Sequence, residues 1–206
     1  TPIEVTKKRE GEVNYLKDFS PSLGTSTAEV PGPGYLYQID ATIADVYLVS
    51  EQDRTEIIGR PTMYFVVDVF SRAIVGMYIG LENPSWVSAM EALGNAMADK
   101  VAYCAEHGID ITPDMWPMRG LPEHIIGDKG EMLGRHVEVL SKAFHVEIQN
   151  TPAYRADWKG IVERRFKILN DTLVHQLMGT TRGRHYIRGD RDPRLEAALT
   201  LNEVTK

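Results

Sequence analysis

The order of its apolar segments constrains the fold of this 206-residue chain more than any other feature. Three consecutive segments, at 35–49, 62–70 and 73–80, are rich in β-branched and aromatic residues, and the tight Ser71-Arg72 turn joins the last two. Strands joined by such short connections pair with their neighbours in the chain, so these segments predict an antiparallel meander at the start of the globular part.

Helices and single strands alternate after this meander. Asn83-Pro84-Ser85 supplies a cap and a helix-compatible proline for one helix that runs from about Trp86 to the stop at Gly108. The remaining segments predict, in order, a strand at 124–126, a helix marked by Val137, Leu140 and Phe144, a strand at 146–148 and a helix from 160 to about 178. This order predicts an α/β domain with five strands covered by helices.

Three regions differ in composition. Residues 1–34 mix charge with Pro, Gly, Ser and Thr, and predict an N-terminal linker with one short helix near 13–19. Residues 35–178 hold the strands and long helices and predict one globular core. Residues 179–206 begin with an Arg- and Gly-rich run and predict a basic C-terminal strap with a short helix at 195–201. Because the chain begins with Thr, we expect a core taken from a longer protein, with the strap leading to a further domain.

Composition argues against several classes of protein. No apolar segment approaches the roughly 20 residues of a membrane-spanning helix, and nothing at the start resembles a signal peptide, so a cytoplasmic, nucleoid-associated location is expected. The lone Cys104 excludes a disulfide within the chain and argues against a structural zinc site. The net charge of −6 argues against a self-sufficient nucleic-acid binder. Residues 151–195 nevertheless carry ten Lys or Arg against five acids, so DNA contacts are expected there.

Three carboxylates stand where a metal site can form. Asp40 ends the apolar run at 35–39, Asp128 follows the strand predicted at 124–126, and Glu163 lies in the first turn of the last long helix. Polynucleotide phosphoryl transfer uses oxygen ligands that hold two Mg²⁺ roughly 4 Å apart, one for the attacking oxygen and one for the leaving oxygen. Asp45 and Asp68 compete for this role, but Asp68 is better explained as a partner of the Ser71-Arg72 turn.

The helix that begins near 160 has two faces at roughly 100° per residue. The predicted core stripe consists of Val162, Phe166, Leu169, Leu173 and Leu177, and the flank beside it of Glu163, Lys167 and Asn170. Arg164 and Lys167 suit either phosphate contact or a solvated face, and Trp158 suits either packing or base stacking. The basic run from 182 to 194 is open to the same two interpretations, a solvated strap or a docking site for DNA or a partner.

Four short motifs surround these acids: Gln38-Ile-Asp40-Ala-Thr42, Asp68-Val-Phe-Ser71-Arg72-Ala-Ile-Val75-Gly76, Gly127-Asp128-Lys-Gly130 and Lys159-Gly160-Ile-Val162-Glu163. Together they resemble the first-Asp strand, hairpin, second-Asp turn and Glu helix of the DDE transposase and retroviral-integrase superfamily. The resemblance covers about residues 35–178. Around Glu163 the sequence is most similar to the B-subunit (TnsB) family of heteromeric transposons of the Tn-seven type.

The resemblance implies an RNase H-like fold, whose five-stranded mixed sheet has three antiparallel strands and then two parallel ones. It implies cleavage of DNA 3′ ends by water and attack of the freed 3′-OH on target DNA, with no covalent enzyme intermediate. Two Mg²⁺, or Mn²⁺ as a substitute, would be held by Asp40, Asp128 and Glu163. The implied partners are double-stranded transposon-end and target DNA, further copies of the chain on that DNA, an endonuclease subunit and an ATPase regulator.

Candidate DNA contacts are less firmly indicated than the metal ligands. They are Arg155, Lys159, Arg164, Lys167 and Asn170. Trp158 and Asn170 stand where integrases often carry Pro and Lys, which weakens the case for helix contacts with DNA ends.

Two alternative functions stay open at this stage. An RNase H-like nuclease that stops at hydrolysis would use the same three ligands. A core without activity that docks DNA or a partner protein would fit the net charge of −6, because an acidic domain holds DNA poorly at physiological salt.

Overall fold

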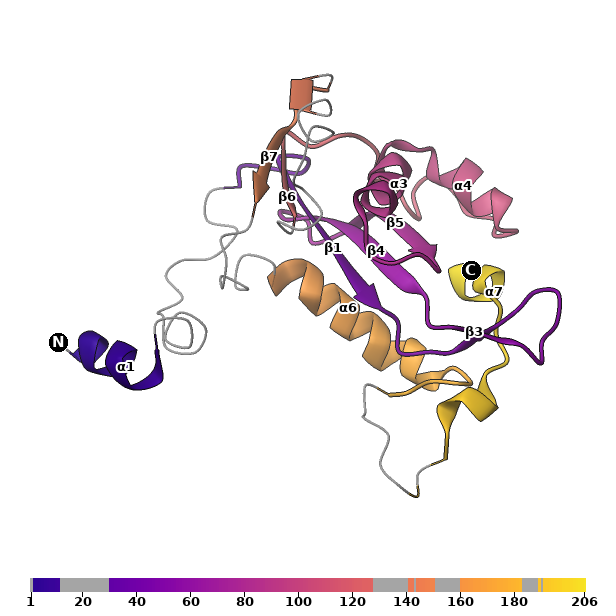
Figure 1. Ribbon diagram of the computed structural model, residues 1–206. Coiled ribbons are helices and arrows are strands. Elements are labelled where there is room, and N and C mark those ends of the chain that lie inside the picture. The colour runs from indigo at the N-terminus through magenta and orange to yellow at the C-terminus, as the bar shows by residue number, and fades with distance from the viewer. Residues whose placement is uncertain are drawn as a thin grey trace.

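The protein is built around one five-stranded sheet, seen in a computed structural model that describes residues 2–11, 30–127, 141–142, 144–150, 160–182, 189 and 191–206 (Figure 1). Its strands, in the order β5-β4-β1-β6-β7, are β5 (Ile74–Gly80), β4 (Thr62–Asp68), β1 (Leu36–Ile43), β6 (His124–Gly127) and β7 (Glu147–Asn150). The first three pair antiparallel, while β6 and β7 run parallel to β1. This confirms the predicted RNase H-like class of fold, three antiparallel strands followed by two parallel ones.

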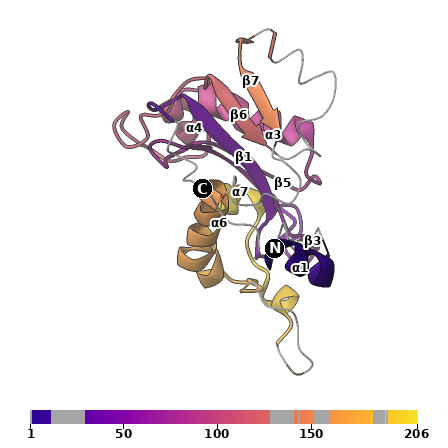
Figure 2. The same ribbon diagram turned by 90° about the vertical axis from the view of Figure 1, so that its left-hand side faces the viewer.

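Strand alternation assigns the side chains of β1 to two faces. Tyr37 and Ile39 enter the core cluster that includes Ala92 and Leu93 of helix α3 (Trp86–Met97). Gln38 and Asp40 therefore point to the other face, where helix α6 (Gly160–Thr172) packs. The two views show α3 and α6 on opposite faces of the sheet (Figure 1, Figure 2).

Small residues bring α3 close to the sheet. A Cβ added at Gly76 of β5 would lie 2.4 Å from the Ala92 carbonyl oxygen, so this position requires glycine. Of the predicted capping segment Asn83-Pro84-Ser85, Ser85 is the residue that caps α3, because its Oγ accepts a hydrogen bond from the Ser88 N–H at 3.3 Å.

The single helix predicted from Ser85 to Gly108 is wrong, because the structure has two helices there. Helix α3 ends at Met97, and α4 (Lys100–Glu106) begins after Asp99, whose carboxylate accepts hydrogen bonds from Val101 N–H and Ala102 N–H at 2.9 and 3.1 Å. The buried Lys100 ammonium caps the end of α3 by donating to the Asn95, Ala96 and Ala98 carbonyls. Gly108, at φ +72°, ends α4 as expected.

Helix α6 lies against β1 and β4 through its apolar stripe. Val162 and Phe166 are buried as predicted, and Phe166 stacks on Phe65 with ring centroids 4.7 Å apart. The helix ends at Thr172 rather than near 178, and a 3₁₀ turn, η3 (Val174–Gln176), follows. The prediction that Leu173 is in the core is consequently wrong, since 53% of it is exposed.

The segment between β1 and β4 forms a small second sheet. Strands β2 (Leu48–Val49) and β3 (Ile57–Gly59) pair there, so the strand predicted at 35–49 is in fact two strands in separate sheets. The C-terminal segment crosses this sheet: Tyr47 N–H donates to the Gly179 carbonyl at 3.0 Å, and Val49 N–H to the Leu199 carbonyl at 2.9 Å. This segment thus returns to the core.

The helix predicted at 195–201 is shifted in the structure. A 3₁₀ turn, η4 (Pro193–Glu196), comes first, and helix α7 (Leu201–Thr205) begins after Thr200, which forms a capping box with Glu203. Helix α7 packs near β5.

Several sequence predictions fall outside the described residues. Those are the helix near 13–19, most of the helix around Val137 and Leu140, and the third predicted ligand, Asp128. A helix that was not predicted, α1 (Pro2–Glu10), lies near the start. Among the residues described, none of the helices has the length and apolar character needed to cross a membrane.

Candidate active site

Two of the three predicted metal ligands line the same pocket. Asp40 comes from β1 and Glu163 from the first turn of α6, and the pocket between them has a volume of about 360 Å³. We call it the acidic groove; its lining residues are Asp40, Ala41, Thr42, Asp45, Glu163, Phe166, Lys167, Asn170, Asp171 and His175. Packing therefore brings together two elements that lie more than a hundred residues apart in the chain, as the predicted metal site requires.

Gln38 connects the strand of Asp40 to the helix of Glu163. Its side chain is 1% exposed, and its Oε1 accepts a hydrogen bond from the Val162 N–H at 3.2 Å. Val162 is the third residue of α6, and N–H groups in a first helical turn have no partner within the helix. Gln38 thus caps α6 from the neighbouring strand and fixes the turn that carries Glu163.

A network of ion pairs occupies the far end of the groove. Asp45 accepts from Arg60 Nη2 at 2.6 Å and lies 3.2 Å from His175 Nε2. Asp171 lies 3.1 Å from Lys167 Nζ and 3.6 Å from the His175 Nδ1. Asp45 and Asp171 are therefore held by cations.

The predicted DNA contacts are placed unevenly. Lys167 and Asn170 line the groove together with Glu163, as their shared helix face predicts. Arg164 is exposed but does not line it, and Arg155 and Lys159 lie outside the described residues. Asn170 Oδ1 is buried and has no hydrogen-bond partner among the described residues, so it is an acceptor in need of a donor.

Sequence reasoning missed Asp171 and His175 as groove residues. They follow Glu163 by two and by about three helical turns, positions that return to the same face of a helix. The signal was present for Asp171, but His175 lies beyond the end of α6, in η3, where the helical period no longer places it.

Asp68 is explained by the turn, as predicted. Its Oδ2 accepts from the Ser71 N–H at 2.7 Å and from Ser71 Oγ at 2.5 Å, and its Oδ1 from the Gly34 N–H at 2.9 Å. The carboxylate is 1% exposed and fully used by these bonds, so it does not compete with Asp40.

The donor chemistry of the groove fits a hard cation. Asp40 and Glu163 offer only oxygen, which Mg²⁺ and Mn²⁺ prefer. Among the described residues no group of three or more His, Cys, Asp or Glu side chains is arranged to hold a metal. Because Asp128 is not among them, the structure shows only part of the predicted ligand set.

Comparison with known sequences decides the family. Residues 38–179 match the sequence profile of the TnsB C-terminal domain, a span that contains both acids of the groove. The chain belongs to the TnsB C-terminal domain family. It is 48% identical over 193 residues to the transposon Tn7 transposition protein TnsB of Escherichia coli, covering 93% of this chain and 28% of that protein. This confirms the resemblance inferred from the four motifs.

The chain also has more distant similarities. The chain is 26% identical over 148 residues to the transposase for transposon Tn552 of Staphylococcus aureus, covering 71% of this chain and 28% of that protein. The catalytic core domain of HTLV-2 integrase, in complex with magnesium, shares 17% identity at a TM-score of 0.41 and covers 70% of this chain and 72% of its own. This member of the TnsB C-terminal family spans 28% of the length of the two curated relatives.

Proposed function

We propose that this chain is the catalytic core of a DNA transposase, which cleaves transposon 3′ ends and joins them to target DNA. The observation that carries the proposal is that Asp40 and Glu163, from remote parts of a TnsB-family chain, line one groove. Similarity to the two transposition proteins supports the substrate class, double-stranded DNA.

Asp40, Asp128 and Glu163 are the proposed metal ligands, with Asp40 shared between two sites. Asp128 follows β6 directly in the sequence, and β6 runs parallel beside β1 with Ile126 opposite Gln38, which supports its place in the set. Two Mg²⁺ held there would supply Lewis-acid stabilisation of the attacking and leaving oxygens. Gln38 keeps Glu163 in position, and Lys167 and Asn170 are placed to contact the DNA end.

The proposed assembly follows from the reaction. Joining two transposon ends to one target needs at least two such sites, so we infer that several copies act together on DNA. An endonuclease subunit and an ATPase regulator remain expected partners, as the family resemblance implies.

The decisive assay uses this chain in its full-length context, with Mg²⁺, a target plasmid and transposon-end DNA that is either intact or already cleaved at the 3′ end. Asp40→Asn, Asp128→Asn and Glu163→Gln should each abolish cleavage and joining while leaving folding intact. Asp110→Asn, which removes an exposed acid in the loop after α4, is the matched control and should behave as the unaltered protein.

Each other outcome has a defined meaning. Near-normal joining by the Asp40→Asn protein would overturn the assignment of the ligands. Hydrolysis of intact ends without joining of pre-cleaved ends would identify a nuclease. Absence of both reactions together with absence of Mn²⁺ binding in calorimetry would identify a docking core.

A further inference from the structure

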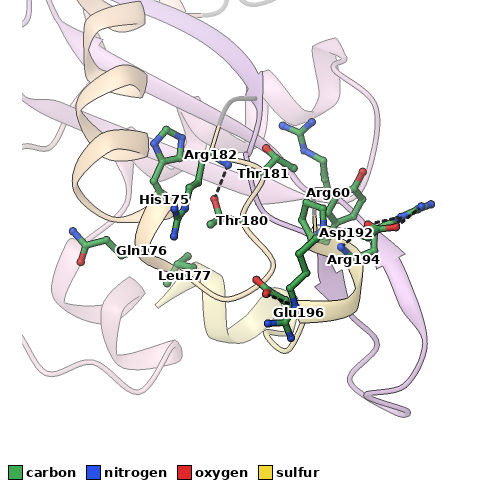
Figure 3. Close-up of a pocket in the computed structure, with 13 residues that line it drawn as sticks. Arg60, His175, Gln176, Leu177, Thr180, Thr181, Arg182, Asp192, Arg194 and Glu196 are labelled. Atoms are coloured by element: carbon green, nitrogen blue, oxygen red, sulfur yellow. Dashed lines mark hydrogen bonds and ion pairs between the residues drawn. The ribbon is translucent and has the colours of Figure 1, made fainter. Parts of the chain in front are cut away.

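A second pocket adjoins the acidic groove and has the opposite charge. Its volume is about 590 Å³, and His175 lines both it and the groove. We call it the basic pocket; it is lined by Arg60, Arg182, Arg191 and Arg194 with Tyr47, His175, Gln176, Leu177, Thr180, Thr181, Asp192, Pro193 and Glu196 (Figure 3). Four arginines thus face two carboxylates in a chain whose net charge is −6.

Segments remote in sequence are pinned together to form this pocket. Thr180 Oγ1 and the Thr181 N–H both donate to the Asp45 carbonyl at 2.8 Å, and Val46 forms a bridge with Thr180. Arg182 comes next and has a left-handed backbone conformation, with φ +51°. Its N–H donates a hydrogen bond to Thr180 Oγ1 at 3.1 Å. The backbone that carries Arg182 is therefore anchored to the segment between β1 and β2.

The arginines differ in how firmly they are held. Arg60 is partly buried and bonded to both Asp45 and the Ala44 carbonyl, which makes it part of the structure. Arg191 pairs with Glu196 at 2.8 Å and Arg194 with Asp192 at 2.6 Å, but both arginine side chains are well exposed, at 77% and 59%. For Arg182 no ion pair with a described residue is present, and its side chain is directed toward His175 (Figure 3).

Guanidinium groups in this state suit a phosphate ligand. Exposed ion pairs are weak and exchange easily, while arginine binds phosphate oxygens through two parallel hydrogen bonds. Arg182 can therefore turn to a phosphate at small cost, and Arg191 can do so by exchanging its exposed partner Glu196. Arg194 stays bonded to Asp192 and adds its positive charge to the same wall.

The basic pocket continues the line of the groove along α6. Glu163, Lys167 and Asp171 follow one face of α6 at four-residue intervals, and His175 lies just beyond its end, in η3. All four line the groove, and the pocket begins at His175. Nine helical steps from Glu163 to Thr172 cover roughly 14 Å at 1.5 Å each. At 3.4 Å per base pair, this equals roughly four base pairs of duplex.

We propose that the basic pocket binds a backbone phosphate of the DNA duplex, about four to five base pairs from the phosphate that reacts between Asp40 and Glu163. The contact fixes where the duplex lies along α6, and it is independent of base sequence because only phosphate oxygens are read. The distance between the two phosphates rests on the proposed function, whereas phosphate binding itself does not.

The first test measures duplex binding by fluorescence anisotropy over a range of salt concentrations at fixed Mg²⁺. The Arg182→Gln, Arg194→Gln double variant should lower the slope of log affinity against log salt by about 0.9, the value for one phosphate, and each single variant by no more than that, for any DNA sequence. Arg54→Gln is the matched control. Arg54 also pairs with the side chain of an acid in the C-terminal segment, Glu203 at 2.6 Å, but it lies outside the pocket. Slopes equal to that of Arg54→Gln, or no binding by the unaltered chain at low salt, would overturn the proposal.

The second test locates the phosphate. Pre-cleaved transposon ends carry one neutral methylphosphonate at successive positions, and joining is measured in the full-length context. A methylphosphonate at one position, or at two neighbouring positions, should weaken DNA binding and joining by the unaltered protein. The same substitution should have no further effect on the Arg182→Gln, Arg194→Gln double variant. Equal sensitivity of both proteins at every position would contradict the inference. Because Glu163→Gln should keep the same binding pattern without joining, loss of the reaction and loss of the phosphate contact are distinguished.

Discussion

The acidic groove and the basic pocket adjoin beyond the C-terminal end of α6 and share His175, yet they differ in charge and construction. The groove has four carboxylates, Asp40, Asp45, Glu163 and Asp171, against one lysine, while the pocket has four arginines against two acids. Net charge is therefore a poor guide to what this chain binds. The groove suits cations and the pocket suits phosphate, and a metal-dependent reaction on DNA needs both.

Construction separates the two regions as clearly as charge does. The groove rests on a central strand and a helix, with buried anchors at Gln38 and Phe166. The pocket is assembled from loops and 3₁₀ turns that depend on backbone bonds to residues 45–49. Packing of the C-terminal segment should consequently control the pocket far more than the groove, and this contrast can be tested.

The largest effect is expected from Gly179→Ala. Gly179 has φ +78°, and an added Cβ would lie 2.8 Å from Ala197 Cα, so strain and overpacking together should cost roughly 3 kcal/mol or more of unfolding free energy. Urea titration measures this loss. The salt slope of DNA binding should fall with it, while Mn²⁺ affinity stays unchanged. Gly120→Ala, at φ +138° with open space around it, is the control for strain without a clash; an equal loss of Mn²⁺ affinity in Gly179→Ala would show that the regions are not independent.

Metal binding should raise the unfolding free energy of the chain, and this gain should depend on residues of the groove and not on those of the pocket. At Mn²⁺ concentrations 100 times the dissociation constant, the unaltered chain should gain about 2.7 kcal/mol. Asp40→Asn and Glu163→Gln should lose this gain in thermal unfolding, whereas Arg182→Gln should retain it. If Asp45→Asn removed the gain as completely as Asp40→Asn, the metal would lie at the far end of the groove.

Gln38→Met tests the connection between β1 and α6. The substitution keeps the side-chain volume but leaves the Val162 N–H without its acceptor, at a cost of about 1–3 kcal/mol. Mn²⁺ affinity and joining should fall because Glu163 is held less firmly, with the salt slope of DNA binding unchanged. Gln52→Met, at an exposed glutamine between β2 and β3 that lines neither the groove nor the pocket, should have neither effect. Loss of stability without loss of metal affinity would mean that Gln38 only supports the fold.

The smallest effect lies outside both regions, at Lys100 on the other face of the sheet. Burial lowers the pKa of Lys100 from 10.5 to about 8, with nearby Arg119 adding to the shift. Between these values the unfolded chain binds the proton that the folded chain has released, so this residue makes stability rise with pH in that window. Lys100→Met should remove the rise, seen as the difference between urea midpoints of the two proteins at pH 8 and pH 9.5. Identical pH profiles would refute the shift; DNA and Mn²⁺ binding should not change.

Local patterns predicted much of this structure. Runs of β-branched and aromatic residues marked the strands of the main sheet, the helical period put Glu163, Lys167 and Asn170 on one side of α6, and Asp68 matched its turn. These signals succeed because a strand or helix period and a capping bond act over a few neighbouring residues.

Local patterns failed where a helix ends before its apolar spacing does. The apolar spacing from Trp86 to Cys104 continues through a break that Asp99 and Lys100 create by capping two helices at once. Leu173 continues the stripe of α6, but the helix has already ended, so the residue is half exposed.

The sequence by itself determined the strands of the main sheet, the family and the two groove acids. The strands follow from short-range patterns, whereas the family and the acids follow from motifs, and the parallel pairing of the sheet was implied by the family resemblance. Only the tertiary structure decided that Asp45 meets His175 across 130 positions, that Gly179 admits the C-terminal segment beside Tyr47, and that the arginines gather at the end of an acidic groove. Such pairings depend on how separate elements pack. Contacts that close a long segment of chain produce no periodic pattern in the sequence around the residues that meet.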